Sequence, residues 1–398
     1  MKNLLKRKLS TPVARGACDV VAKLQQAGYQ ALVVGGAVRD LLLDREPKDY
    51  DIATNATPEE VKRVFRKRGR IIGRRFKLVH VYQNGMTYEV STFRRTPTEE
   101  ERKGRPDDDG IMVWRDNVYG TLEDDAFRRD FTVNALYLDP LRLEDGVKDF
   151  VNGLEDIQNA YVRTIGDTQL RLHEDPVRVL RALKLMGQYS FRLSDELEAA
   201  LPEAMPKIQK ASKLRLLEEI FKILRRQWSE PTFSVFMDYG LMDYLFPGLA
   251  EEWRSSRGRD VRGLLAERDR LLKEEKIFPS RITGVAIMLI PRLQEMLNDG
   301  SSLFWRNFNG IDKILQEEIR RFMTPYPIPR HVVAKIRDVL LLLPKLVAAK
   351  NRKRVVRHPE YERGKDLLTL LAHYYDIDQG ILDYWPAPSE KRRGRKRL

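Results

Sequence analysis

The stretch that decides the fold is Val33-Val34-Gly35-Gly36-Ala37-Val38-Arg39-Asp40, which Lys48-Asp49-Tyr50-Asp51-Ile52 follows closely. The apolar run at residues 31–34 predicts a buried strand that ends in a glycine turn. Gly35 and Gly36 allow the backbone to come close to a phosphate, and a short helix over residues 37–43 is expected to begin there. This helix would carry Arg39 and Asp40 on its first turns.

Two carboxylates that could share metal ions come next in the chain. Asp49 and Asp51 flank Tyr50 at the start of an expected second strand. Residues i and i+2 of a strand point to the same face and lie about 6.6 Å apart at Cα. Such a pair can hold one or two Mg²⁺ ions, which in turn bind a triphosphate and activate an attacking oxygen. An isolated Asp-x-Asp is more often a solvated loop, so the neighbouring motifs decide its meaning.

A hairpin is predicted where residues 78–82 and 86–93 alternate around Asn84-Gly85. Glu89 lies on its second strand among tyrosine, valine and threonine. It is therefore a candidate third carboxylate beside the Asp-x-Asp pair, and its alternative is a solvent-facing glutamate.

These motifs resemble the head signature of the class II nucleotidyltransferases, the family of bacterial poly(A) polymerases and CCA-adding enzymes. The signature is Gly35-Gly36-x-x-Arg39-Asp40 followed by Asp49-x-Asp51. Arg128-Arg129-Asp130-Phe131-Thr132-Val133-Asn134 resembles the family's arginine-arginine-aspartate motif. Glu174-Asp175-Pro176-Val177-Arg178 is similar to the motif that recognises the incoming base. The resemblance is dense over residues 31–225 and thin over 250–320.

The resemblance implies an α+β fold. An N-terminal nucleotidyltransferase head with a small mixed β-sheet and helices would be followed by an all-α neck, body and tail region. The expected parts are a catalytic head (1–152), a helical neck with the base-recognition helix (153–230), a helical body that binds RNA (231–385) and a disordered basic tail (386–398).

The resemblance also implies roles for individual residues. Catalysis would depend on Asp49, Asp51, Glu89 and Asp130, with Asp49 and Asp51 as metal ligands. The residues expected to bind the nucleotide are Gly35, Gly36, Arg39, Asp40, Arg128, Arg129, Asp130, Asn134, Asp175, Arg178 and Arg181. Plain structural meanings stay open at two motifs, a helix-end salt bridge at Asp130 and a capped helix at Asp175.

Several expectations concern the rest of the chain. Residues 1–12 are basic and are expected to be mobile, and the sequence beyond residue 152 predicts helices throughout. Residues 254–270 are highly charged and predict a loop that leads into an exposed helix. Within residues 213–226 an apolar stripe predicts a buried helix face made of Leu214, Leu217, Ile220, Phe221 and Leu224.

The charge of the chain indicates its partner. There are 72 Lys and Arg against 58 Asp and Glu, which gives a net charge of +14 and a pI near 9.6. Such an excess favours a polyanion, nucleic acid first and an anionic membrane surface second. No apolar run approaches the roughly 18 residues of a membrane span. The single cysteine, Cys18, fits a cytoplasmic protein.

Two basic segments are candidates for contact with RNA. No acidic residue lies between Glu60 and Lys77, and this run fits a solvated face as well as it fits contact with nucleic acid or triphosphate. The terminal run 391–397 is too uniformly charged to pack and predicts a disordered tail that contacts RNA. The residues expected to bind RNA are Arg74, Arg75, Lys77, Lys391, Arg392, Arg393, Arg395, Lys396 and Arg397.

The predicted activity is template-independent polyadenylation of RNA 3′ ends. ATP would be the substrate, Mg²⁺ (or Mn²⁺) the cofactor and pyrophosphate the leaving group, in the processing and decay of bacterial mRNA. Residues 72–81 look like the poly(A) polymerase form of this segment. The expected partners are the RNA 3′ end and ATP, with accessory RNA-decay proteins left open. One alternative is a CCA- or A-adding enzyme for tRNA, and another is a catalytically inactive RNA-binding protein.

Overall fold

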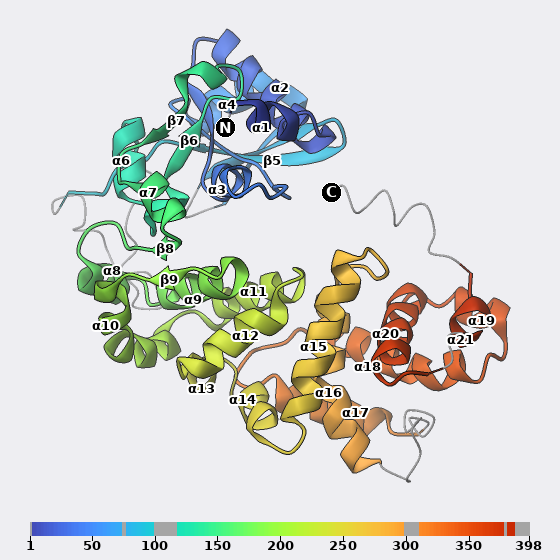
Figure 1. Ribbon diagram of the computed structural model, residues 1–398. Helices are drawn as coiled ribbons and strands as arrows, with labels where there is room; N and C mark the ends of the chain where they lie inside the picture. The colour runs from blue at the N-terminus through green and yellow to red at the C-terminus, as the bar shows by residue number, and fades with distance from the viewer. Residues whose placement is uncertain (1, 74–76, 99–117, 298–309, 378–379, 387–398) are drawn as a thin grey trace. The chain divides into compact units, whose positions relative to one another are not determined.

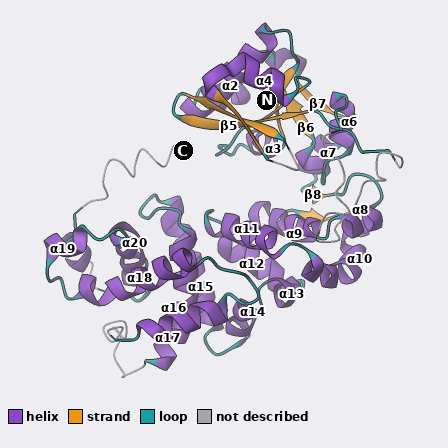
Figure 2. Ribbon diagram, turned by 180° about the vertical axis from the view of Figure 1, so that it is seen from behind, coloured by secondary structure: helices purple, strands orange, loops and turns teal. Residues whose placement is uncertain are grey.

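The computed structural model describes residues 2–73, 77–98, 118–297, 310–377 and 380–386. Two compact units make up this part of the chain. Within the described residues, the first comprises those up to Arg171 together with Arg192–Ala199, and the second comprises Leu172–Phe191 and those from Ala200 to Pro386. The first unit contains the sheet, whereas the second consists of helices (Figure 2). The described chain is therefore α+β, as predicted.

A seven-stranded mixed sheet forms the centre of the first unit, in the order β3-β4-β5-β2-β1-β6-β7. β2 and β5 pair in parallel, and the other neighbouring pairs are antiparallel. The strands are β1 (Ala31–Val34), β2 (Asp51–Thr54), β3 (Gly69–Ile72), β4 (Leu78–Gln83), β5 (Met86–Thr92), β6 (Leu136–Leu138) and β7 (Val147–Asp149). The predicted hairpin is confirmed in β4 and β5, whereas the edge strand β3 was not predicted, because its short apolar stretch lies inside the basic run.

Helices cover the sheet and connect its strands (Figure 1). They are α1 (Lys2–Lys8), α2 (Pro12–Gln26), α3 (Gly36–Leu42), α4 (Pro58–Phe65), α6 (Leu122–Phe127), α7 (Gly153–Gln158) and the short helices η1 (Arg66–Arg68), η2 (Thr132–Asn134) and η3 (Leu143–Asp145). The prediction of helices alone beyond residue 152 is wrong at β8 (Tyr161–Val162) and β9 (Arg192–Leu193), which pair in parallel. Strands of two residues are too short to produce a detectable period.

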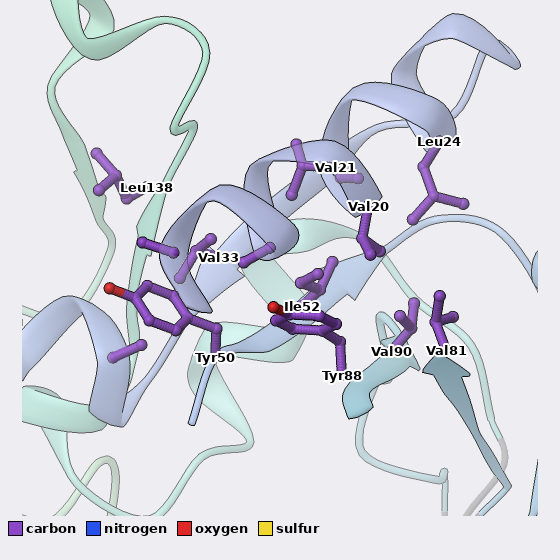
Figure 3. Close-up of a cluster of buried hydrophobic side chains, with 14 of the residues drawn as sticks. Val20, Val21, Leu24, Val33, Tyr50, Ile52, Val81, Tyr88, Val90 and Leu138 are labelled. Atoms are coloured by element: carbon purple, nitrogen blue, oxygen red, sulfur yellow. The ribbon is translucent and has the colours of Figure 1, made fainter. Parts of the chain in front are cut away.

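Both faces of β1 are buried. Val33 packs into a cluster with Val20, Val21 and Leu24 of α2 (Figure 3), whereas Leu32 and Val34 pack into a second cluster. Burial on both sides explains why the strand is apolar at every position instead of at alternate ones. Each such side chain contributes about 1.5–3 kcal/mol on burial. The packing therefore fixes the strand, and with it the point at which Gly35 ends the strand.

The expectation of a mobile N-terminus is wrong for the described residues. Leu5 of α1 and Leu9, one helical turn further on, are buried in the same cluster as α2. An apolar pair at i and i+4 gives this basic segment one face that packs onto the core. The positive charge of the segment concealed that pattern.

The second unit is a helical array. Its helices are α9 (Val177–Tyr189), α11 (Lys213–Leu224), α12 (Ser229–Asp238), α13 (Leu241–Leu245), α14 (Pro247–Arg254), α15 (Gly258–Lys273), α16 (Arg281–Met296), α17 (Asp312–Phe322), α18 (Arg330–Val347), α19 (Arg352–Val356), α20 (Tyr361–Tyr374), α21 (Gly380–Asp383) and the short η4 (Met205–Lys210). Two further helices, α8 (Thr168–Glu174) and α10 (Asp195–Ala204), lie where the chain passes from one unit to the other. No helix within the described ranges combines the length and the apolar character needed to cross a bilayer.

The predicted stripe on α11 is confirmed except at its first residue. Leu217, Ile220, Phe221 and Leu224 are buried, whereas Leu214 is 60% exposed. Leu214 lies in the first turn of the helix, where no neighbouring element covers it.

In the charged segment 254–270 a short turn at residues 255–257 leads into a helix as expected, but that helix is packed and not exposed. α15 buries Val261, Leu264 and Leu265, together with Arg268. The Arg268 guanidinium donates to the backbone oxygen of Arg226 at 3.0 Å and to Asp269 at 2.9 Å. The abundance of charge concealed the apolar i, i+3 and i+4 positions.

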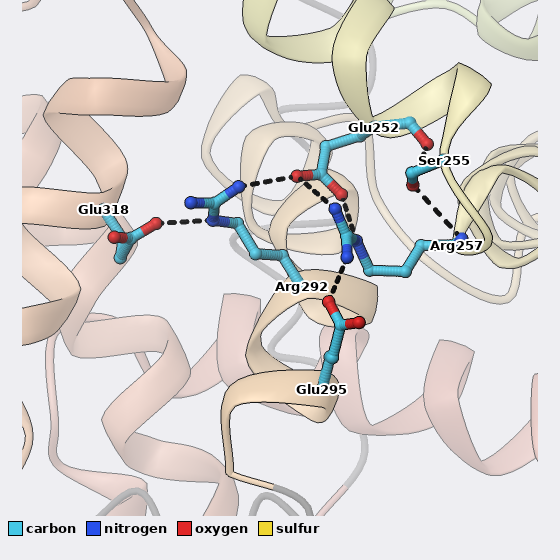
Figure 4. A network of polar contacts seen from close by, with 6 residues as sticks. All are labelled: Glu252, Ser255, Arg257, Arg292, Glu295 and Glu318. Carbon is cyan, nitrogen blue, oxygen red and sulfur yellow. Dashed lines mark hydrogen bonds and ion pairs between the residues drawn. The ribbon is translucent and has the colours of Figure 1, made fainter.

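Arginine–carboxylate pairs connect three helices of this unit, α14, α16 and α17, and the turn before α15 (Figure 4). The buried Glu252 of α14 accepts from Arg257 at 2.6 Å and from Arg292 of α16 at 2.9 Å. Arg292 also donates to Glu318 of α17 at 2.6 Å. The positive charge of these arginines is therefore neutralised within the fold.

Candidate active site

The glycine turn ends β1 beside residues that come from much later in the chain. Gly35 has φ +72°, and its N–H donates to the backbone oxygen of Leu136 at 3.0 Å. A Cβ at this position would lie 3.5 Å from Arg129 Nη1 and 3.5 Å from the backbone oxygen of Asn134. An L-residue would be strained at this φ and would fill the gap between the turn and Arg129.

Arg39 connects the glycine turn to the arginine-arginine-aspartate motif. Its buried guanidinium donates to Asn134 Oδ1 and to Asp40 Oδ1, the latter at 2.9 and 3.2 Å. Asn134 in turn donates to Asp130 Oδ1 at 3.3 Å, and the Phe131 N–H donates to the same oxygen at 2.9 Å. The fold thus brings together two motifs that are separated by about a quarter of the chain, and it holds each of these polar groups in one orientation.

The predicted carboxylates lie on exposed positions of β2 and β5. β2 begins at Asp51, so Asp49 precedes the strand instead of lying in it, but both flank the buried Tyr50 as expected. Glu89 of β5 is the in-register neighbour of Asp51 in the parallel pair. Neighbouring strands lie about 4.8 Å apart. Glu89 is therefore beside Asp51, and its Oε1 lies 3.5 Å from His80 Nε2.

The donor chemistry of Asp49 and Asp51 fits Mg²⁺ or Mn²⁺. In the described ranges no cluster of three or more His, Cys, Asp or Glu side chains is arranged to hold a metal ion. Mg²⁺ usually binds one or two carboxylates and takes its other ligands from water and substrate phosphates. Two exposed carboxylates on either side of a buried tyrosine meet this requirement.

Arg129 is held in place by Asp125 and Tyr137. Its Nε and Nη2 donate to Asp125 Oδ2 at 3.1 and 2.7 Å, and the Tyr137 hydroxyl donates to the same oxygen at 2.8 Å. Burial disfavours the charged guanidinium, but the attraction of Asp125 outweighs it and raises the pKa of Arg129. The third nitrogen, Nη1, lies by Gly35. Asp125 therefore directs one face of Arg129 toward the glycine turn.

The backbone of the same motif is held by Arg171 of α8. Its Nη2 donates to the backbone oxygens of Arg128 at 2.7 Å and Arg129 at 2.6 Å. The sequence interpretation missed both Asp125 and Arg171. The i, i+4 spacing of Asp125 and Arg129 was a usable signal, whereas nothing in the sequence connects Arg171 to residues more than forty positions earlier.

The predicted base-recognition residues lie in the second unit, at the start of α9. Asp175 Oδ1 accepts from the Val177 N–H at 3.2 Å, but α9 begins at Val177 instead of Pro176, so the N-cap position belongs to Pro176 and not to Asp175 as predicted. Glu174 ends α8 and is not on α9, yet its Oε2 lies 3.7 Å from Arg178 Nη1. Arg181 lies partly buried about one turn further along α9.

Arg215 of α11 forms a two-fold contact with Asp175 that the sequence did not predict. Nη1 donates to Oδ1 at 3.1 Å and Nη2 donates to Oδ2 at 2.6 Å. A planar guanidinium bound in this way fixes the plane of the carboxylate as well as its position. The two residues are 40 positions apart, so no local pattern could have joined them.

The predicted RNA-binding residues are described only in part. Lys77 lies with its Nζ 3.5 Å from Glu59 Oε1. Arg74, Arg75 and the tail residues Lys391, Arg392, Arg393, Arg395, Lys396 and Arg397 lie outside the described residues.

Known proteins share this architecture. Residues 31–163 match the poly A polymerase head domain, and residues 190–252 match the probable RNA- and SrmB-binding site of polymerase A. The poly(A) polymerase I of Haemophilus influenzae is 34% identical over 370 residues, which cover 90% of this chain and 80% of that protein. The CCA-adding enzyme of Lactobacillus helveticus is 38% identical over 227 residues, which cover 57% of this chain and 54% of that protein.

A solved structure shares most of the fold. The CCA-adding enzyme of Bacillus stearothermophilus in complex with CTP has a TM-score of 0.62 and 27% sequence identity, and the match covers 97% of this chain and 82% of that one. The two motifs that Arg39 joins both lie within the matched head domain. The chain therefore belongs to the poly(A) polymerase family of nucleotidyltransferases, which also includes the CCA-adding enzymes.

Proposed function

We propose that this protein is a poly(A) polymerase that extends RNA 3′ ends with AMP from ATP and releases pyrophosphate. The observation that carries the proposal is the row of exposed carboxylates, in which Asp51 and Glu89 are neighbours on parallel strands and Asp49 lies two residues away. Similarity to poly(A) polymerase I over most of the chain supports adenylate as the group transferred. We assign this activity to the bacterial cytoplasm and to mRNA processing.

Asp49 and Asp51 would hold Mg²⁺, or Mn²⁺ in its place. The bound ions would lower the pKa of the RNA 3′-hydroxyl and neutralise charge on the triphosphate. Glu89 keeps the row anionic and orients Asp51. The 3′-oxygen would attack the α-phosphorus and lose its proton to solvent. The bond between the α-phosphorus and the α–β bridging oxygen would break, and pyrophosphate would leave with the electron pair. Most of the catalysis is then positioning and charge neutralisation.

The arginines of the head would bind the phosphates and the ribose. Gly35 and Gly36 leave space for a phosphate next to Arg129 Nη1, since a Cβ at Gly35 would come within 3.5 Å of that nitrogen. Arg39, Asp40 and Asn134 form a connected set that orients Asp130 for a ribose hydroxyl. Arg128 would contact the triphosphate from the same motif.

Asp175, Arg178 and Arg181 would select adenine. Asp175 offers an acceptor and Arg178 offers donors to the edge of a base, so a protein surface replaces the nucleic-acid template. We assign head, neck, body and tail to residues 1–152, 153–230, 231–385 and 386–398. RNA would be bound by the body and tail and by the 74–77 segment of the head, with accessory proteins left open.

The second candidate is a CCA-adding enzyme. The similarity to the Bacillus stearothermophilus enzyme over 97% of this chain favours it. The experiment incubates the purified protein with an unrelated RNA, or with tRNA that lacks its CCA end, in the presence of each NTP separately. A poly(A) polymerase adds many A residues to both RNAs and uses CTP poorly. Efficient CTP addition to the truncated tRNA, followed by one A and a stop, would contradict the proposal.

A further inference from the structure

Six cations on the outer edge of the head have no role in the site described above. They lie within nine consecutive residues that form the end of α4, η1 and the start of β3, and all six are exposed. We call this group the basic edge, and its members are Lys62, Arg63, Arg66, Lys67, Arg68 and Arg70.

Among the described residues the cations of the basic edge form no close ion pair, although the hydrogen bonds from Thr57 and, to a smaller extent, the charge of Arg63 lower the pKa of Glu60. Within the described ranges none of the six cations has a carboxylate oxygen within 4.0 Å. The two acids that precede the run are already bound. Glu60 accepts from the Thr57 N–H at 2.8 Å and from the Thr57 hydroxyl at 2.9 Å, and Glu59 faces Lys77. The arginines of the second unit in Figure 4 differ, because each is paired with glutamate.

One member of the basic edge, Arg70, is connected to the row of carboxylates by the register of the sheet, whereas α4 packs on the opposite face, against Val79 and Val81. Arg70 on β3 is opposite His80 on β4, His80 is opposite Glu89 on β5, and Glu89 is next to Asp51 on β2. In-register neighbours point to the same face, and the 3.5 Å contact of His80 with Glu89 agrees with this. Three strand spacings of about 4.8 Å place Arg70 about 14 Å from Asp51. The row thus runs from a cation at the edge to the metal ligands.

An exposed aromatic ring lies beside this row. Tyr82 is two residues after His80 on β4, so it points to the same face, and it is 43% exposed. Basic grooves that hold single-stranded nucleic acid typically combine cations for the phosphates with aromatic rings on which bases stack. An anionic membrane surface would use the cations but would gain little from one tyrosine on a sheet.

We propose that the basic edge binds the phosphate backbone of single-stranded RNA a few nucleotides upstream of the 3′ end, with Tyr82 stacking on a base. The identity of the RNA as the substrate strand depends on the proposed function, whereas binding itself does not. The surface adds to the expected contacts of the 74–77 segment and the tail.

The test measures how RNA binding depends on salt. The variant Lys62→Gln/Arg63→Gln/Lys67→Gln/Arg70→Gln removes four charges from the basic edge. The control Arg7→Gln/Arg163→Gln/Lys207→Gln/Lys222→Gln removes four cations that pair with carboxylates and lie outside the segments proposed to bind RNA. Fluorescence anisotropy of a labelled single-stranded RNA gives Kd over a series of KCl concentrations. Circular dichroism melting checks that both variants fold.

Each phosphate contact to a single strand contributes about 0.7 to the slope of log Kd against log [KCl]. We expect the slope of the basic-edge variant to fall by up to about 2.8, and its KM for RNA to rise by a larger factor than its kcat falls. A second variant, Lys62→Gln/Arg63→Gln, is expected to lose up to about 1.4 of the slope. The control is expected to keep the wild-type slope.

A wild-type slope in the basic-edge variant, or an equal loss in the control, would overturn the proposal. A second result would also overturn it. If the wild-type protein binds phosphatidylglycerol vesicles, and the basic-edge variant loses this binding but keeps the wild-type salt slope for RNA, the surface binds a membrane and not RNA. Failure of the wild-type protein to add AMP would contradict the proposed function and leave the binding measurement standing.

Discussion

Replacement of Arg215 by alanine tests whether Asp175 recognises the base from a fixed orientation. The change removes two hydrogen bonds of 3.1 and 2.6 Å and leaves Asp175 with its contact to the Val177 N–H. The carboxylate can then rotate about χ2, so it offers its oxygens to a base in several directions. The expected result is weaker selection of ATP over CTP.

The exposure of the pair sets the size of the effect. A charged hydrogen-bonded pair contributes about 1.5–3 kcal/mol when it is shielded from water. The Arg215 side chain is 53% exposed and that of Asp175 is 21% exposed, so screening reduces the contribution to about 1 kcal/mol. Discrimination between ATP and CTP should therefore fall about fivefold, since 1.4 kcal/mol corresponds to about tenfold.

The assay compares kcat/KM for ATP and for CTP in single-nucleotide addition to one RNA. The control is Arg254→Ala, because Arg254 is 54% exposed and forms the same two-fold contact with Asp243, at 2.5 and 2.6 Å, on helices that carry no predicted site residue. Arg215→Lys keeps the positive charge but cannot form two parallel hydrogen bonds to the carboxylate, so it should recover only part of the discrimination between ATP and CTP. An unchanged ATP:CTP ratio in Arg215→Ala, or an equal loss in Arg254→Ala, would refute the reasoning.

Three further outcomes follow from the geometry. Asp51→Asn should abolish AMP addition without lowering Tm, because its side chain is exposed and is proposed to hold the metal ion; a wild-type rate would remove it from catalysis. Gly16→Ala should cost about 1–3 kcal/mol in urea unfolding, because its Cβ would lie 2.1 Å from the Tyr88 hydroxyl; an unchanged midpoint would contradict the packing. Burial opposes the ionised Glu219, but Lys184 and Lys222 outweigh it and lower its pKa to about 2. Its stabilisation is therefore present above its ordinary pKa of 4.5 and is lost as pH falls toward 2. Near neutral pH, Glu219→Gln should lower the free energy of unfolding by about 3 kcal/mol. The difference between variant and wild type should become smaller as the pH falls. A difference that does not change with pH would argue against this ion pair.

The sequence predicted the parts of the fold that depend on local patterns. The apolar run before Gly35 predicted β1, and the Asn84-Gly85 turn predicted the β4–β5 hairpin. The alternation of side chains along β5 placed Glu89 on one face with Thr87 and Ser91, and that face is the exposed one. These signals work because backbone geometry and burial act within a few residues. The same local reasoning failed at α1 and α15, where a high density of charged residues concealed the apolar face of the helix.

The sequence predicted the candidate site residues that lie within motifs. It did not predict the residues that fix these motif residues in place by hydrogen bonds. Arg129 was recognised, but Arg171, which binds its backbone oxygen, was not. Asp175 was recognised, but Arg215, which fixes its carboxylate, was not. Residues of this second kind act through contacts that form only when distant helices pack. A single sequence gives no signal for such contacts, except where the two residues are four positions apart on one helix.

The parallel pairing of β2 with β5 has a consequence for how the head is made. Parallel neighbours require a crossover, and here the chain passes through α4, β3 and β4 before Glu89 can reach Asp51. On a ribosome the glycine turn and both aspartates emerge well before residue 89, and β1 waits longer still for β6 at residues 136–138. A nascent chain therefore contains the two proposed metal ligands before it contains the third carboxylate of the proposed row. If Asp49, Asp51 and Glu89 act together as proposed, the head becomes able to catalyse the reaction only after residue 89 has been synthesised.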